Sequence, residues 1–233
     1  MKTCMYKIII IAPFLNSTCV MILLNGCVAY YPKGVDIPLI KEKGDVRIDG
    51  GFFVAQGSGT SELETVLGVQ STFSAGITKM IAIQGYVNFD LLGNGYLQGA
   101  TGLFKKLGDK TVIELYGGYG LGGAENKGND YHPFAYDYKY QLAFAQFNFG
   151  RTDVGGAKID YGLGLKSGYL YTKHIFPAAT VYENGGILEP SVFFRIGSRK
   201  VKFCARVNYL WTDVIVEYYY FPVSVSLGVN INL

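Results

Sequence analysis

Apolar and polar residues alternate along much of this chain, most clearly over residues 221–233. Apolar side chains occupy every second position there: Phe221, Val223, Val225, Leu227, Val229, Ile231 and Leu233. Small or polar residues fill the positions between them. Because successive side chains of a strand point to opposite faces, this segment predicts a strand with one entirely apolar face. It is longer than the five or six residues usual in soluble sheets and reaches the roughly 9–11 that a tilted strand needs to cross a bilayer.

The same period recurs upstream and predicts ten strands. They cover residues 45–56, 62–74, 81–91, 96–107, 111–122, 139–151, 157–171, 187–197, 200–211 and 221–233. The connections after even-numbered strands are short, whereas three of those after odd-numbered strands, 123–137, 172–186 and 213–220, are long. Bacterial membrane barrels have short periplasmic turns and longer outer loops. We therefore predict an all-β fold, an antiparallel up-and-down transmembrane β-barrel over residues 44–233, with eight strands as the alternative count.

The first 26 residues predict a lipoprotein signal peptide. Lys2 and Lys7 precede an apolar run at 8–15, and a basic start before an apolar core is typical of secretion. The sequence Leu24-Asn25-Gly26-Cys27 then resembles the lipobox of bacterial lipoproteins, in which the cysteine is acylated. We expect cleavage before Cys27 and a covalent diacylglycerol and acyl modification on it, and we predict no other cofactor.

Residues 27–43 are expected to form an acylated periplasmic tether. Pro32, Gly34, Pro38 and the mixed charges at 41–43 favour an extended chain without a regular element. The tether should hang in the periplasm between Cys27 and the first strand. Residues 28–31 lack the acidic side chains that surface-displayed lipoproteins tend to carry after the cysteine. We therefore expect the anchor in the periplasmic leaflet of the outer membrane.

Composition agrees with a membrane barrel and excludes other classes. Aromatic residues make up 15% of the chain and charged residues only 17%, against roughly a quarter charged in soluble domains. After Cys27 no apolar run has the length of a spanning helix. Processing would leave Cys204 as the only unmodified cysteine, so no disulfide framework is predicted. The mature chain has 19 basic and 18 acidic residues, which is no footprint for nucleic acid.

The parity of the last strand, carried through the barrel, predicts which charges face the lumen. A charge facing lipid near mid-membrane costs about 2–4 kcal/mol, so inward sorting is expected for any function. The set contains six acids and five bases, and this near-balance favours mutual pairing over an ion-selective field. We therefore predict a side-chain plug, with a narrow pore as the alternative. The predicted lumen charge network is Asp45, Arg47, Asp49, Glu64, Glu114, Asp160, Lys166, Glu189, Arg195, Lys202 and Arg206.

Aromatic side chains near the predicted strand ends favour an interfacial girdle, with a carbohydrate-stacking surface as the alternative. They are Tyr119, Tyr140, Tyr169, Tyr171, Tyr209, Trp211, Tyr218, Tyr219 and Tyr220. The glycine-rich run 117–123 lacks the Lys-Ser/Thr of a phosphate loop, and such strand glycines more often let strands bend or make room for aromatic rings. His132 and His174, the only histidines, both fall in predicted outer loops. They give no catalytic constellation and no metal site.

Several segments together resemble the uncharacterised outer-membrane β-barrel lipoproteins of Bacteroidota. They are Leu24–Cys27, the stretch from Tyr31-Pro32 to Asp45, Gly117-Gly118-Tyr119-Gly120, Gln146-Phe147-Asn148 and the ending Gly228-Val229-Asn230. The resemblance implies a barrel without catalytic residues. Leu233 departs from the terminal Phe of many bacterial barrels.

The functional hypothesis is a non-enzymatic, lipid-anchored component of the outer membrane with a structural or partner-binding role. Its expected partners are outer-membrane lipid and, as a further candidate, another outer-membrane protein. A narrow small-solute channel and a soluble β-sandwich periplasmic lipoprotein are the alternatives, and an enzyme acting on lipid or peptide ranks after them.

Overall fold

A computed structural model describes residues 34–58, 63–91, 93–126, 136–156, 158–175, 179–214 and 220–233. The predicted signal peptide, the lipidation site Cys27 and the loop histidine His132 lie outside these residues and stay predictions. In the part of the chain that is described, no helix is long and apolar enough to cross a membrane.

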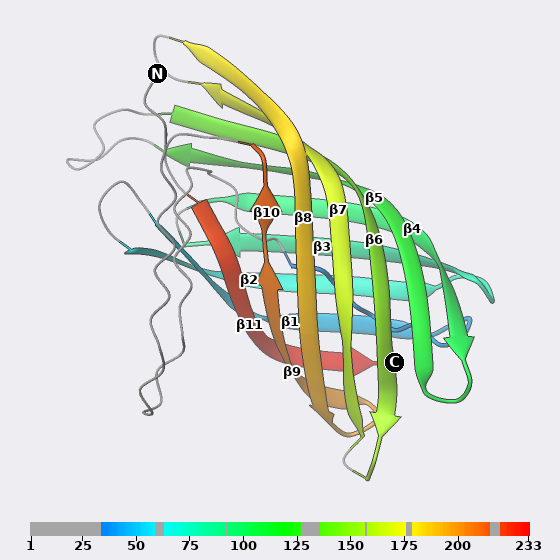
Figure 1. Cartoon of the computed structure of the whole chain (residues 1–233). Helices are drawn as coiled ribbons and strands as arrows, with labels where there is room; N and C mark the ends of the chain where they lie inside the picture. The colour runs from blue at the N-terminus through cyan, green and yellow to red at the C-terminus, as the bar shows by residue number, and fades with distance from the viewer. Residues whose placement is uncertain are drawn as a thin grey trace, which may run out of the picture.

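The described chain is all-β, and its strands follow one another around a closed wall (Figure 1). The strands are β1 (Val46–Ser58), β2 (Leu63–Gly76), β3 (Ile81–Asp90), β4 (Gly95–Leu107), β5 (Thr111–Asn126), β6 (Tyr136–Val154), β7 (Ile159–Ile175), β8 (Thr180–Gly197), β9 (Val201–Tyr209), β10 (Trp211–Thr212) and β11 (Tyr220–Asn232). Each pairs antiparallel with its neighbours, β8 pairs with β9, and β11 lies between β1 and β9. The predicted ten-stranded up-and-down barrel is confirmed, with β10 as a short addition. The eight-stranded count and the open β-sandwich are wrong.

The start of the first strand and the end of the last strand meet at one rim of the barrel. Arg47 of β1 is paired with Asn232 of β11, and the backbone N–H of Leu233 donates to the carbonyl oxygen of Val46 at 3.0 Å. The turns 77–80, 108–110 and 198–200 and the connection between β6 and β7 lie at this rim, which we call the turn end. The opposite rim is the loop end. Closure matters because an unpaired strand edge in lipid would leave backbone groups without partners.

Two of the predicted long loops are wrong in extent. The region 172–186 is almost entirely strand, since β7 continues to Ile175 and β8 already begins at Thr180. Only 127–135 separates β5 from β6 within the predicted loop 123–137. Gly, Asn and charged residues there suggested loops, but two strands that extend together satisfy their backbone groups whatever the side chains are. β6 has 19 residues, well beyond the roughly 9–11 that cross a bilayer. In Figure 1 the wall from β5 to β8 accordingly rises at the upper left.

Two prolines explain why the predicted ninth strand divides into β9 and β10. Leu210, between the two strands, donates its N–H to the carbonyl oxygen of Pro222 at 2.7 Å. Pro190 of β8 lies directly before Ser191, the last residue that pairs with β9. Proline has no N–H to donate, so it interrupts a ladder of backbone hydrogen bonds.

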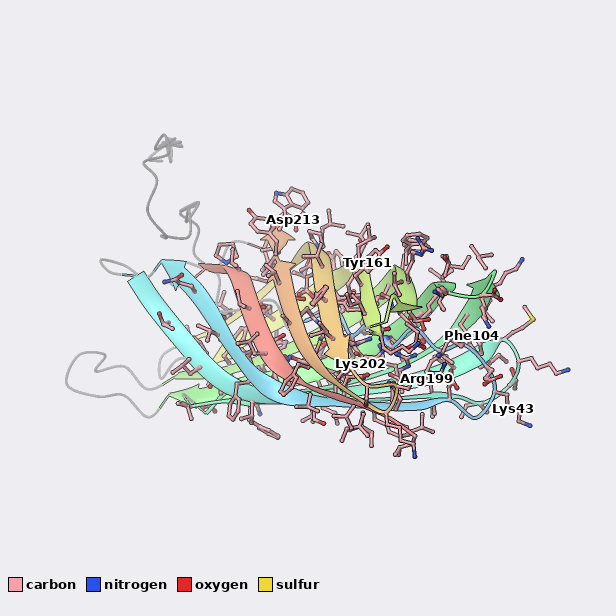
Figure 2. All side chains as sticks on the ribbon, turned by 90° about the horizontal axis from the view of Figure 1, so that it is seen from below. Lys43, Phe104, Tyr161, Arg199, Lys202 and Asp213 are labelled. Carbon is pink, nitrogen blue, oxygen red and sulfur yellow. The ribbon has the colours of Figure 1, made fainter. Side chains whose placement is uncertain are left out.

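The two faces of the wall differ as the period predicts. Aliphatic and aromatic side chains stand on the outer surface (Figure 2), with Leu227 exposed at 62% and Phe203 at 74%. On the inner surface a Cβ added to Gly118, Gly120 or Gly122 would collide with Phe144, Tyr96 or Tyr140 respectively. The expectation that these glycines make room for aromatic rings is therefore confirmed. Tyr140 is only 3% exposed inside the barrel, so its assignment to the outer girdle is wrong.

Leu227→Arg should lower the free energy of unfolding by about 2–4 kcal/mol, because it would place a charge on the outer face halfway along β11. Leu233→Arg, at the turn end, is the matched control and should cost about 0–1 kcal/mol. Urea denaturation of the protein refolded in lipid vesicles measures both. Equal losses for the two variants would show that the outer face is not embedded as proposed.

Candidate functional site

The lumen contains the N-terminal part of the described chain. Residues 34–40, which we call the lumen segment, form no helix or strand, and all seven are buried. Val35, Ile37, Leu39 and Ile40 each have 0% exposed surface. The prediction that this stretch hangs in the periplasm is therefore wrong for residues 34–40. The sequence misled because proline, glycine and mixed charge are equally suited to a solvated tether and to a chain held by its surroundings.

Side chains of the wall bind the backbone of the lumen segment. Lys166 Nζ donates to the carbonyl oxygen of Gly34 at 3.0 Å, and Arg195 Nη2 donates to that of Ile37 at 2.9 Å. The carbonyl oxygen of Asp36 accepts hydrogen bonds from the amides of Gln84, Gln146 and Asn148. An extended segment has no backbone ladder of its own, so these side chains supply the partners that buried backbone groups require.

Asp36 is the charged centre of the lumen segment and is 1% exposed. Its carboxylate accepts hydrogen bonds from Ser74 Oγ at 3.0 Å and Gln84 Nε2 at 2.9 Å. The Arg206 guanidinium lies 3.6 Å from the other carboxylate oxygen. Removing either charge would leave the other buried without a partner, so this pairing should hold the segment in place.

A second cluster of charges lies nearer the turn end. Asp160 contacts Lys202 Nζ at 2.5 Å and Arg47 Nη1 at 3.9 Å. Asp49 contacts Arg195 at 3.2 Å. Because Arg195 also donates to the lumen segment, the segment and the wall belong to one connected network.

A third group fixes the point where the chain leaves the lumen and enters β1. Lys41 Nζ lies 3.3 Å from Asp153, which also contacts Lys202 at 3.0 Å. The Asp45 carboxylate accepts the backbone N–H groups of Lys41 and Glu42 at 2.8 and 3.3 Å. These contacts hold the reversal between the lumen segment and β1.

The structure buries most of the predicted lumen charges. They are Arg47, Asp49, Glu114, Asp160, Lys166, Glu189, Arg195, Lys202 and Arg206. Asp45 is half-buried at the turn end, and the Glu64 side chain lies outside the described residues. Sequence reasoning missed Asp36, Lys41 and Asp153. Parity along a strand says nothing about a segment outside the wall, and it fails at the end of β6, where the register shifts between Arg151 and Val154. The only available signal for Asp36 was a single acid amid the aliphatic residues 35–40.

Asp36 gives one buried cation of the wall its carboxylate partner. Among the described residues, the wall contributes five buried acids, Asp49, Asp90, Glu114, Asp160 and Glu189, and five buried bases, Arg47, Lys166, Arg195, Lys202 and Arg206. The carboxylate of the lumen segment brings the acids to six. An uncompensated buried cation is costly, so the contact of Asp36 with Arg206 at 3.6 Å favours the segment inside the barrel.

Aromatic rings fill the lumen toward the loop end. Tyr96 stacks on Tyr140 with ring centroids 5.7 Å apart, and Tyr138 lies 4.6 Å from the His174 ring. Aliphatic side chains, among them Leu142, pack against these tyrosines. His174 was predicted in an outer loop, which is wrong: it lies within β7 and is 4% exposed.

Little room is left for a solute beside these groups. A cavity of about 20 Å³ lies beside Asp49, Gln70, Cys204 and Arg206, which is enough for about one water molecule. Cys204 is half-buried there and forms no disulfide. Among the described residues, no three His, Cys, Asp or Glu side chains are grouped to hold a metal ion.

Comparisons with known proteins give architecture only. No protein family matches the chain, and no curated protein matches it. The solved structures that match include the attachment invasion locus protein Ail of Yersinia pestis, with 11% identity and a TM-score of 0.41 over 82% of this chain and 99% of that one. The outer membrane protease OmpT of Escherichia coli shows 8% identity and a TM-score of 0.47 over 81% and 97%. Neisserial surface protein A shows 12% and 0.39 over 82% and 100%.

Asp160→Asn should lower the free energy of unfolding by about 3–5 kcal/mol, because it leaves the buried cations Lys202 and Arg47 without their shared carboxylate. Asp109→Asn, in the exposed turn between β4 and β5, is the control and should change it by less than about 0.5 kcal/mol. Urea denaturation in detergent micelles measures both. Similar values for the two variants would mean that the pairing around Asp160 does not stabilise the barrel.

Proposed function

We propose that this protein is a non-enzymatic, lipid-anchored β-barrel of the outer membrane, closed by its own N-terminal segment, with a structural or partner-binding role. The closed strand wall and its apolar outer face support the membrane location, because a barrel leaves no strand edge unpaired in lipid. The short turns favour the periplasm for the turn end. The motifs that resemble lipoprotein barrels of Bacteroidota agree with this proposal.

One observation carries the proposal: the lumen segment is bound inside the barrel, where Lys166 and Arg195 donate to its backbone and Asp36 pairs with Arg206. A channel for solutes needs a continuous polar path. This lumen is instead occupied by residues 34–40 and, toward the loop end, by packed tyrosine rings. The small-solute channel is therefore the weaker alternative. The buried acids and bases contact one another, which suits a plug better than a catalytic site, where a carboxylate or histidine must reach a substrate.

The long strands at the loop end are the surface that we assign to a partner. β6, β7 and β8 extend toward the loop end, and Tyr182 near the start of β8 is 69% exposed. Exposed aromatic side chains are enriched where proteins bind other proteins. Another outer-membrane protein is the partner class that this wall would meet.

The purified protein should be electrically silent in planar lipid bilayers, because the lumen segment blocks the path through the barrel. Asp36→Lys would place a second cation beside Arg206 and should displace the segment, giving discrete conductance steps. Glu42→Lys, in the exposed reversal, is the matched control and should stay silent. Steady conductance of the unmodified protein would instead establish the channel.

Cells fed an alkyne-tagged fatty acid should incorporate it into this protein at Cys27. Cys27→Ser should abolish the label, whereas Cys204→Ser should keep it, because Cys204 lies inside β9. Gel fluorescence of the purified variants measures the label. Equal labelling of Cys27→Ser and the unmodified protein would remove the lipid anchor from the proposal.

A further inference from the structure

The direction of the lumen segment determines where the chain before it must emerge. Lys41 contacts Asp153 at the turn end, and the N–H of Ile40 donates to the Glu114 carboxylate, further inside the barrel. The carbonyl oxygen of Ile37 accepts a hydrogen bond from Arg195. Val35 N donates to Asn208 Oδ1 at 3.4 Å, deeper still, and Gly34 lies next to Gln70 and Arg206. Read from residue 41 back to residue 34, the chain therefore climbs from the turn end toward the loop end.

We propose that the chain is threaded through its own barrel and that the acyl group of Cys27 enters the outer leaflet of the outer membrane. This inference rests on the proposed function, because it requires both the lipid anchor and the assignment of the turn end to the periplasm. The sequence alone led us to expect the periplasmic leaflet, and the path of the lumen segment favours the opposite one.

The distance to the loop end is short enough for this path. Cys27 precedes Gly34 by seven residues, and an extended chain spans about 3.3–3.6 Å per residue, so the two can be about 23–25 Å apart. Gln70, beside Gly34, lies seven residues from Leu63 at the loop end of β2. At about 3.3 Å per residue and a strand tilt of 35–45°, that rim is about 16–19 Å away along the barrel axis. Cys27 can therefore reach the rim.

The rim is also close to the apolar outer surface. Val54 and Leu67 are paired across β1 and β2, and both side chains are exposed on the outer face. Each lies only four residues from the end of its strand, at Ser58 and Leu63. An acyl chain that passes over the loop-end rim between β1 and β2 would therefore reach the lipid within a few residues of that rim.

A return path to the periplasmic leaflet is disfavoured on both sides of the wall. Inside, residues 35–40 are all buried, which leaves no space for a second pass of the chain. Outside, an unpaired chain crossing the hydrocarbon would expose backbone groups at several kcal/mol each. An exit at the loop end avoids both the crowded lumen and the exposure of backbone groups to lipid.

The test labels single cysteines in intact cells with a membrane-impermeant maleimide, in a Cys204→Ser background whose Cys27 is acylated. Thr180→Cys reports the loop end, and Asp109→Cys reports the turn end. Tyr30→Cys lies between Cys27 and the lumen segment. We expect Tyr30→Cys to label in intact cells to the same extent as Thr180→Cys, while Asp109→Cys labels only after the outer membrane is permeabilised.

Labelling of Tyr30→Cys only after permeabilisation, together with Asp109→Cys, would overturn the threading. If Tyr30→Cys labels only after the protein is unfolded in detergent, residue 30 lies inside the barrel. That result would also contradict the proposed exit at the loop end. The two reporter cysteines give the orientation by themselves, and the fatty-acid label gives the anchor. Failure of the threading is therefore distinguishable from failure of the proposed function.

Discussion

Backbone hydrogen bonding in a medium without water is the constraint on which this structure depends. A strand in lipid must find partners on both edges, so the wall has to close, as β1 does on β11 and β8 on β9. Closure creates an interior that must also be filled. The polar side chains excluded from the outer face collect there, where they need partners of opposite charge or complementary hydrogen bonding. The lumen segment provides both.

The alternation of apolar and polar residues predicted most of the barrel wall from the sequence. It placed the ten strands because the apolar rows face lipid and the alternating rows cannot, as Val225 and Leu227 illustrate between Ser224, Ser226 and Gly228. It failed beyond the membrane, where β7 and β8 continue as strands through residues that have no apolar row to reveal them. It also misplaced Tyr140, since an aromatic residue near a strand end can belong to either face.

The lumen segment could not be derived from a pattern. Its position follows from contacts between residues far apart in the chain, such as Asp36 with Arg206 and Lys166 with Gly34, and no local period encodes them. The charge count offered a partial signal: it predicted a nearly neutral interior without indicating that one of the acids would come from outside the strands. The aliphatic residues around Asp36 are unusual for a solvated linker, and that combination is the feature to look for in related sequences.

The antiparallel course of the lumen segment and β1 has a mechanical consequence. A pull on the N-terminus toward the loop end acts along the barrel axis, parallel to the segment. The hydrogen bonds from Gln146, Lys166 and Arg195, on the adjacent strands β6, β7 and β8, would then bear the load together instead of breaking one after another. Because these hydrogen bonds are loaded in shear, the chain resists being pulled out of the barrel. The segment can therefore anchor the N-terminal part of the chain as well as fill the lumen.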